Sequence, residues 1–167
     1  MFIYGTSNMS MDIQSVLIPT ITIRPGMYVR DLFTECGKLH VHALPYCDEK
    51  GHIKGRLTLK NVMKFSCLPE HMIELASLLG NQMSCVENAE EKAQEIICNP
   101  VEPYVRKLGE TITSKEPLIK ALAIMEKYDT SYIFVVDDDE YKGLITIQGI
   151  AQVMSRLENA CTVAEPS

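Results

Sequence analysis

Residues 55–61 read GRLTLKN, and residues 143–149 repeat the pattern as GLITIQG. In each stretch a glycine opens a short run that carries apolar residues, and a threonine stands three positions after the glycine. The apolar residues beyond the threonine take helical spacing. Each stretch therefore predicts a strand that ends at Thr58 or Thr146 and leads directly into a helix.

The repetition extends upstream of these stretches in almost constant register. Thr22 and Thr111 are 89 positions apart, whereas Gly55 and Gly143 are 88 positions apart, so the second copy is one residue shorter. The missing residue falls in an acidic turn between two strands. Such an internal repeat predicts a duplicated unit whose halves pack on each other, with clefts between them in which a ligand would sit.

The expected fold class is α/β (α+β), with two tandem β-α-β-β-α repeats packed pseudo-symmetrically and a helical hairpin inserted between them. The expected boundaries are 1–15 for an N-terminal extension, 16–67 for the first repeat, 68–100 for the inserted helical segment, 101–160 for the second repeat and 161–167 for a C-terminal tail.

Within the first repeat we expect an extended segment over 16–23, a turn at Pro25 and Gly26 that leads into a helix stopped by Gly37, and strands over 41–47 and 53–58. Within the second repeat we expect a strand near Thr111, helices over 116–127 and 147–158, and strands over 132–136 and 142–146.

The composition excludes several classes of protein. The 167 residues carry a net charge of −6 with a pI near 5.2, which argues against a general nucleic-acid binder. No apolar run approaches the roughly 20 residues that a membrane span needs, and residues 1–10 lack the pattern of a secretory signal. The six cysteines show no regular spacing, so we expect reduced thiols in a cytoplasmic protein.

The order of these landmarks resembles the cystathionine-β-synthase (CBS) domain pair. The shared features are a strand with a proline, an acidic turn with a glycine, and the sequence Gly-x-x-Thr-x-x-Asn/Asp before a helix. The match covers residues 15–66 and 103–158, and it departs at Gly149 and Phe134, where the family usually has an acid and a proline. The resemblance implies a regulatory protein that binds adenine nucleotides or adenosyl compounds between its repeats and associates into a flat disc.

The resemblance, together with the chemistry of a nucleotide, suggests the site residues. Thr58 and Thr146 lie at strand-to-helix junctions, where a hydroxyl either caps the helix or faces a phosphate. Asn61, one helical turn after Thr58, takes the ribose position that the family implies, and Gly149 offers no side chain there in the second copy. We therefore expect the first site to be the better one.

The other candidates are weaker singly, because most would be buried or solvent-facing without any ligand. For the adenine slot they are Ile18, Pro19, Thr20, Ile21, Ala43 and Leu44 in the first site, and Leu108, Tyr132 and Ile133 in the second; for the phosphate they are Arg24, His42, Arg56 and Lys60.

The function expected is a regulatory module that senses AMP, ADP, ATP or S-adenosylmethionine, with no required cofactor, no catalytic residues and no metal. We also expect a homodimer and an unidentified protein partner that responds to the ligand. The alternative is a structural or dimerisation module without ligand. A third possibility, a metal- or thiol-dependent enzyme, depends on His40, His42, Cys36 and Cys47, whose spacing is not that of a zinc site.

Overall fold

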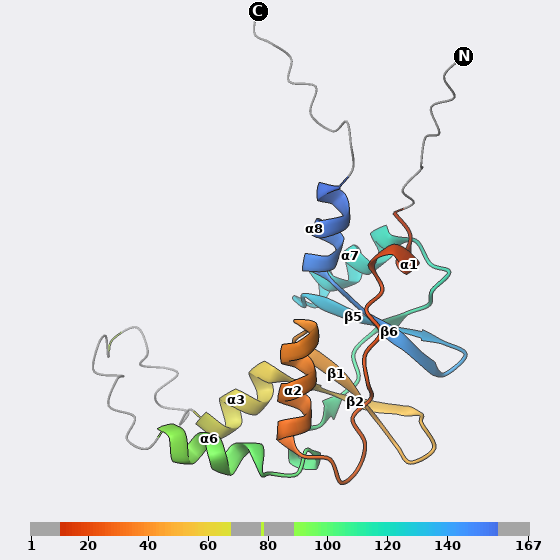
Figure 1. Ribbon diagram of the computed structural model, residues 1–167. Helices are drawn as coiled ribbons and strands as arrows, with labels where there is room; N and C mark the ends of the chain where they lie inside the picture. Colours follow the sequence, from red (N-terminus) through yellow and green to blue (C-terminus); the bar gives the residue numbers. More distant parts are fainter. Residues whose placement is uncertain (1–10, 68–77, 79–88, 157–167) are drawn as a thin grey trace, which may run out of the picture. The chain divides into compact units, whose positions relative to one another are not determined.

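The computed structural model describes residues 11–67, 78 and 89–156. The chain divides into two compact units (Figure 1). Within the described residues, unit 1 comprises 11–19, 110–137 and 142–156, and unit 2 comprises 20–67, 78, 89–109 and 138–141. Each unit holds one three-stranded sheet. The mixed α/β class predicted from the repeats is confirmed.

Unit 2 is built around an antiparallel sheet in the order β1-β2-β3. Its elements are α2 (Val29–Leu39), β1 (Ala43–Cys47), β2 (Ile53–Thr58), α3 (Leu59–Cys67), α6 (Ala89–Ile97), η2 (Glu102–Tyr104) and β3 (Arg106–Lys107). Helix α2 buries Val29, Leu32 and Cys36, which share one face because they recur at helical spacing. Helix α6 packs against α2 and α3.

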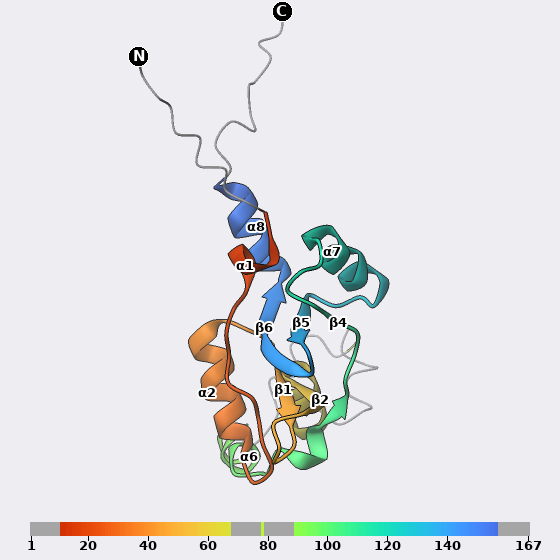
Figure 2. The ribbon, with the colours of Figure 1, turned by 90° about the vertical axis from the view of Figure 1, so that its right-hand side faces the viewer.

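Unit 1 holds a sheet in the order β4-β5-β6, which Figure 2 shows with the three strands side by side. Its elements are α1 (Ile13–Val16), β4 (Thr111–Ile112), α7 (Leu118–Lys127), β5 (Tyr132–Asp137), β6 (Glu140–Thr146) and α8 (Ile147–Ser155), of which the first two residues of β6 belong to unit 2. Strand β4 runs parallel to β5, with Thr111 opposite Phe134. The core joins Ile112, Ile133 and Ile145 of the sheet to the inner faces of α7 and α8.

Each unit includes a segment from the start of the other repeat. In unit 2, Arg106 of β3 pairs with Arg56 of β2. In unit 1, Ile18 forms an antiparallel bridge with Leu144. Arg56 and Leu144 are 88 positions apart, as Gly55 and Gly143 are, and Ile18 and Arg106 are 88 apart where Thr22 and Thr111 are 89 apart, so the two pairings correspond to within one residue of the repeat. The two compact units therefore do not coincide with the two contiguous repeats of the sequence. The predicted repeat boundaries remain a prediction.

The N-terminal part of this exchanged segment is better ordered than the sequence predicts. Asp12 caps α1 by accepting a hydrogen bond from the Ser15 N–H at 2.9 Å. Ile13 and Val16, which are 1% and 4% exposed, lie in the core of unit 1. Neither α1 nor β3 was predicted, because elements of four and two residues are too short to show periodicity; the equally short β4 was predicted from the repeat.

Most element predictions are confirmed within one or two residues, including the strand over 53–58, but one helix end was wrong. Helix α2 continues through Gly37 and stops at His40, whose backbone is left-handed at φ 54°. A glycine inside a helix costs only about 1 kcal/mol, so the other helical residues outweigh it. Of the predicted hairpin over 68–100, residues 68–77 and 79–88 lie outside the described residues.

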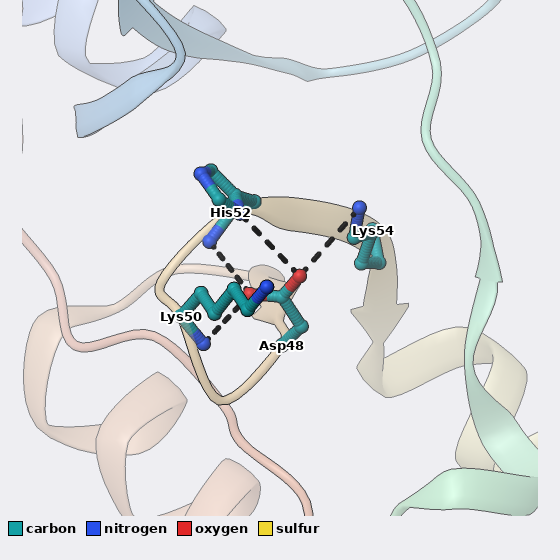
Figure 3. Close-up of polar contacts among 4 residues, drawn as sticks. All are labelled: Asp48, Lys50, His52 and Lys54. Carbon is teal, nitrogen blue, oxygen red and sulfur yellow. Dashed lines mark hydrogen bonds and ion pairs between the residues drawn. The ribbon is translucent and has the colours of Figure 1, made fainter.

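Asp48 and Asp137, which occupy equivalent positions of the two repeats, accept hydrogen bonds from different parts of the chain. In the β1–β2 turn, Oδ1 of Asp48 accepts the backbone N–H groups of Lys50 and His52, both at 2.9 Å (Figure 3). Its Oδ2 lies 3.5 Å from both His52 Nδ1 and Lys54 Nζ. Partial desolvation opposes these contacts, but together they hold the pKa of Asp48 below its usual range. In unit 1, Asp137 instead accepts the Ser114 N–H at 2.8 Å.

Candidate functional site

The end of the β1–β2 ladder gathers most of the residues predicted for the first site. Ala43 lies directly opposite Thr58 in the ladder. The next bond outward runs from the Leu59 N–H to the carbonyl oxygen of His42 at 3.0 Å. Asn61 follows in the first turn of α3. Four candidates, His42, Ala43, Thr58 and Asn61, therefore share one end of the unit 2 sheet.

Thr58 is an N-cap of α3. Its Oγ1 accepts the backbone N–H of Asn61 at 3.1 Å, and both side chains are half-buried. A hydroxyl carries one proton and two lone pairs, so a capping threonine still has its proton to give. Capping and contact with a phosphate are therefore compatible at this residue.

A segment beside β1 adds Thr20 and Ile21 to the same end. Ile23 forms a parallel bridge with Tyr46, and its N–H donates to the carbonyl oxygen of Pro45 at 2.9 Å. Because the pairing is parallel, the residues two and three before Ile23 lie level with the start of β1. Ile21 is 42% exposed, which is unusual for a large apolar side chain beside a core strand. Two further candidates for the adenine slot, Ile18 and Pro19, belong to unit 1.

The apolar residues predicted to line the adenine slot are too deeply buried for their side chains to contact a ligand. Ala43 and Leu44 are 0% exposed, and Ile133 in the second copy is 2% exposed. Their side chains lie in the cores of their own units, as expected for residues that would be buried without any ligand. A ligand would contact the backbone of these residues, or the exposed Ile21, and not their side chains.

The second copy repeats this arrangement but has no side chain at the position that corresponds to Asn61. Thr146, only 7% exposed, caps α8 by accepting the Gly149 N–H at 2.9 Å, and Ile147 donates to the carbonyl oxygen of Ser131 at 2.9 Å. Half-buried Tyr132 lies on β5, its ring 5.3 Å from that of Phe134. Gly149 is ordinary helix, because the positive-φ glycines of the described chain are Gly26, Gly51 and Gly143.

Tyr141 is a residue that the sequence did not single out. Its hydroxyl oxygen lies 2.8 Å from Oγ1 of Thr20 in unit 2. Burial raises the pKa of the Tyr141 phenol, and the Thr20 contact opposes that rise. A lone tyrosine in a strand gives no sequence signal of such a contact, since 121 positions separate the two residues.

The thiol and metal alternatives receive no support from the geometry. Burial, with a smaller effect of Glu35, raises the pKa of Cys36 to about 12, and burial likewise raises that of Cys47. Protonated, enclosed thiols are poor nucleophiles. His40 and His42 are exposed. In the part of the chain that the structure describes, no three His, Cys, Asp or Glu side chains form a group that could hold a metal ion.

A separate groove of about 560 Å³ lies on unit 1, outside every predicted site residue. Met11 and Asp12 line it on one side, and residues 114–119 with Leu122 line it on the other. Among the described helices, none is long and apolar enough to cross a membrane.

Comparison with known proteins identifies a family over part of the chain. Residues 95–156 match the family model of the CBS domain. No curated protein matches the chain significantly.

Solved structures resemble nearly the whole chain. A CBS domain-containing protein of unknown function from Kribbella flavida is 16% identical with a TM-score of 0.64, over 87% of this chain and 99% of that one. The CBS domain of a CBS domain-containing membrane protein from Sphaerobacter thermophilus is 15% identical with a TM-score of 0.61, over 84% and 85%. The CBS domain pair of protein MJ0100, in complex with 5′-methylthioadenosine and S-adenosyl-L-methionine, is 20% identical with a TM-score of 0.57, over 86% and 94%. At these identities the likeness shows the fold.

Proposed function

We propose that this chain, whose residues 95–156 match the CBS domain, is a regulatory module of that family that binds an adenine nucleotide or adenosyl compound in unit 2. The observation that carries the proposal is the grouping of Thr58, Asn61 and the Thr20–Ile21 segment at one end of the sheet. The bound ligands of the protein MJ0100 domain pair give the class of compound to test.

Each part of such a ligand has a candidate partner in this group. The Asn61 amide offers an acceptor and two donors to a ribose diol, and the Thr58 hydroxyl offers its proton to a phosphate or carboxylate oxygen. The first backbone N–H groups of α3 favour negative charge. Ile21 supplies exposed apolar surface for an adenine ring.

The regulatory mechanism follows from differential affinity. A ligand that binds one arrangement of the chain more tightly shifts the population toward it, and a protein partner then responds to that arrangement. No step in this mechanism requires catalysis or a bound cofactor.

Isothermal titration with AMP, ATP and S-adenosylmethionine tests the proposal. We expect Asn61→Ala to weaken binding of the preferred compound by about 1–2 kcal/mol, the scale of a lost hydrogen bond. Gln148→Ala, which removes an exposed amide from the start of α8, is the matched control and should leave binding unchanged. Equal binding by the wild type and the Thr58→Ala/Asn61→Ala double variant would refute the proposal.

The second candidate function is a structural or dimerisation module without a ligand. It is favoured by the two departures from the family pattern, the missing side chain at Gly149 and Phe134 at the position of the usual proline. Native mass spectrometry separates the two candidates, because a regulatory module should carry or accept a nucleotide and a structural one should not.

A further inference from the structure

The contact between Tyr141 and Thr20 joins two parts of the sequence at the proposed site. Tyr141 lies on β6, the strand of the second repeat that ends at Thr146, and Thr20 precedes the first helix of the first repeat. Their oxygen atoms are 2.8 Å apart and part-buried. Burial raises the pKa of the phenol, so Tyr141 stays protonated at neutral pH.

Counting protons gives the direction of this hydrogen bond. Oγ1 of Thr20 also lies 3.0 Å from the carbonyl oxygen of Ile21, and a carbonyl only accepts. Thr20 has a single hydroxyl proton, and that proton goes to Ile21. Tyr141 is therefore the donor to Thr20, and Thr20 has no proton left for a ligand.

This arrangement matters because Thr20 belongs to the proposed site. A ligand acceptor that takes the Thr20 proton must displace the Ile21 carbonyl group, whereas a ligand donor that binds Oγ1 from the side of Tyr141 must displace the phenol. The bond to Ile21 is between adjacent residues and is solvent-exposed, whereas the bond to Tyr141 is part-buried and spans distant parts of the chain.

We propose that Tyr141 is a positioning residue that closes the Thr20 side of the site without ligand, and that an adenosyl ligand displaces its hydroxyl from Thr20. The inference rests on the proposed function and adds how that site is regulated. Tyr141 lies at the start of β6, the strand that ends at Thr146 and leads into α8.

Titration of the wild type and of Tyr141→Phe with AMP, ATP and S-adenosylmethionine tests the inference. We expect Tyr141→Phe to bind the preferred compound about two- to ten-fold more tightly, since a hydrogen bond of ordinary net strength no longer has to be broken. Tyr128→Phe is the matched control, because the Tyr128 hydroxyl donates to Glu110 at 2.7 Å in unit 1. That control should bind as the wild type does.

A double-mutant cycle shows whether Tyr141 acts through Thr20. In a Thr20→Val background the acceptor is gone, so Tyr141→Phe should no longer change the affinity. A merely structural role of Tyr141 would leave the same effect in both backgrounds and would overturn the inference.

The outcomes separate this inference from the proposed function. If the wild type binds a probe and Tyr141→Phe binds it equally or more weakly, the inference fails and the function stands. If neither protein binds any probe, both fail. Should Tyr141→Phe not fold, the wild type still decides: with tyrosine-selective isotope labelling, the NMR resonance of the Tyr141 ring should shift on saturation with the bound probe. An unchanged spectrum overturns the inference.

Discussion

Ile18 and Leu144 exchange both backbone hydrogen bonds. The Ile18 N–H donates to the Leu144 carbonyl oxygen at 2.8 Å, and the Leu144 N–H donates back at 3.0 Å. This close approach explains the glycine that precedes Leu144. A Cβ at Gly143 would lie 2.6 Å from the carbonyl oxygen of Ile18, and a Cβ at Gly55 in unit 2 would lie 2.6 Å from that of Arg106. The first glycine of each repeated stretch thus makes room for the exchanged segment.

Replacing these glycines should therefore destabilise the protein. We expect Gly55→Ala and Gly143→Ala each to lower the free energy of unfolding by about 1–3 kcal/mol, the usual range for overpacking against backbone that must shift. Gly37→Ala is the control, because it lies within α2 with open space around its Cβ position and should be neutral or stabilising. Urea denaturation measures all three. A similar effect at all three positions would show that backbone entropy, and not the close approach, explains the repeated glycine.

The equivalent of Asp48 in unit 1 predicts sensitivity to acid. Hydrogen bonds from the Ser114 side chain and then its backbone hold the pKa of Asp137 below its usual range, against a partial desolvation that would raise it. A carboxyl whose pKa is lowered by folding stabilises the protein above the unfolded pKa, about 3.9 for aspartate, and loses this contribution as the pH falls through the lower folded pKa.

We therefore expect Asp137→Asn to reduce the free energy of unfolding at pH 7, with the difference from the wild type shrinking below about pH 4. Asp138→Asn removes an equal charge from the exposed turn, where asparagine tolerates the positive φ, and is the control. Denaturation between pH 7 and pH 3 checks both variants. A difference that stays constant with pH would contradict the assignment.

Gly149 allows the second site to be tested by gain of function. Gly149→Asp places a carboxylate one helical turn after Thr146, and its Cβ would lie 3.2 Å from Thr146 Oγ1, which requires a shift of only a few tenths of an ångström. If the proposed function holds, we expect the variant to bind an additional equivalent of AMP or to bind AMP more tightly. Gly149→Ala adds the same Cβ without the charge and should not. A folded Gly149→Asp with unchanged stoichiometry and affinity counts against a usable second site.

The homodimer remains a prediction, and the structure limits the apolar residues that are exposed enough to form its interface. Most residues of the expected apolar faces, such as Leu32, Val62 and Val153, are buried in their own units. Helix α8 still presents Ile147 and Met154, which are 49% and 50% exposed and lie on one face at helical spacing.

We expect the Ile147→Glu/Met154→Glu variant to shift the sedimentation-equilibrium mass from that of a dimer toward the 18.8 kDa of one chain. Gln152→Glu, at an exposed polar position of the same helix, is the charge control and should leave the mass unchanged. A wild-type mass of one chain at every concentration would refute the homodimer.

The sequence by itself determined the elements inside each repeat. Strand β2 was predicted at its observed bounds, and the helices after Thr58 and Thr146 begin where the repeated stretches indicate. These features are local, because strand alternation, helical spacing and capping side chains act within a few residues of one another. The duplication strengthened the prediction of these elements, since the same local pattern occurs twice in register.

Only the tertiary structure decided which segment completes each unit. Ile18 joins the sheet edge beside Leu144, and Arg106 joins the one beside Arg56, although each belongs to the other repeat. A single bridge or a two-residue strand has no periodicity, so its partner depends on which distant sheet edge has unpaired backbone groups and a glycine to admit it. The same holds for Tyr141 and Thr20, whose contact across 121 positions depends on packing and leaves no local pattern.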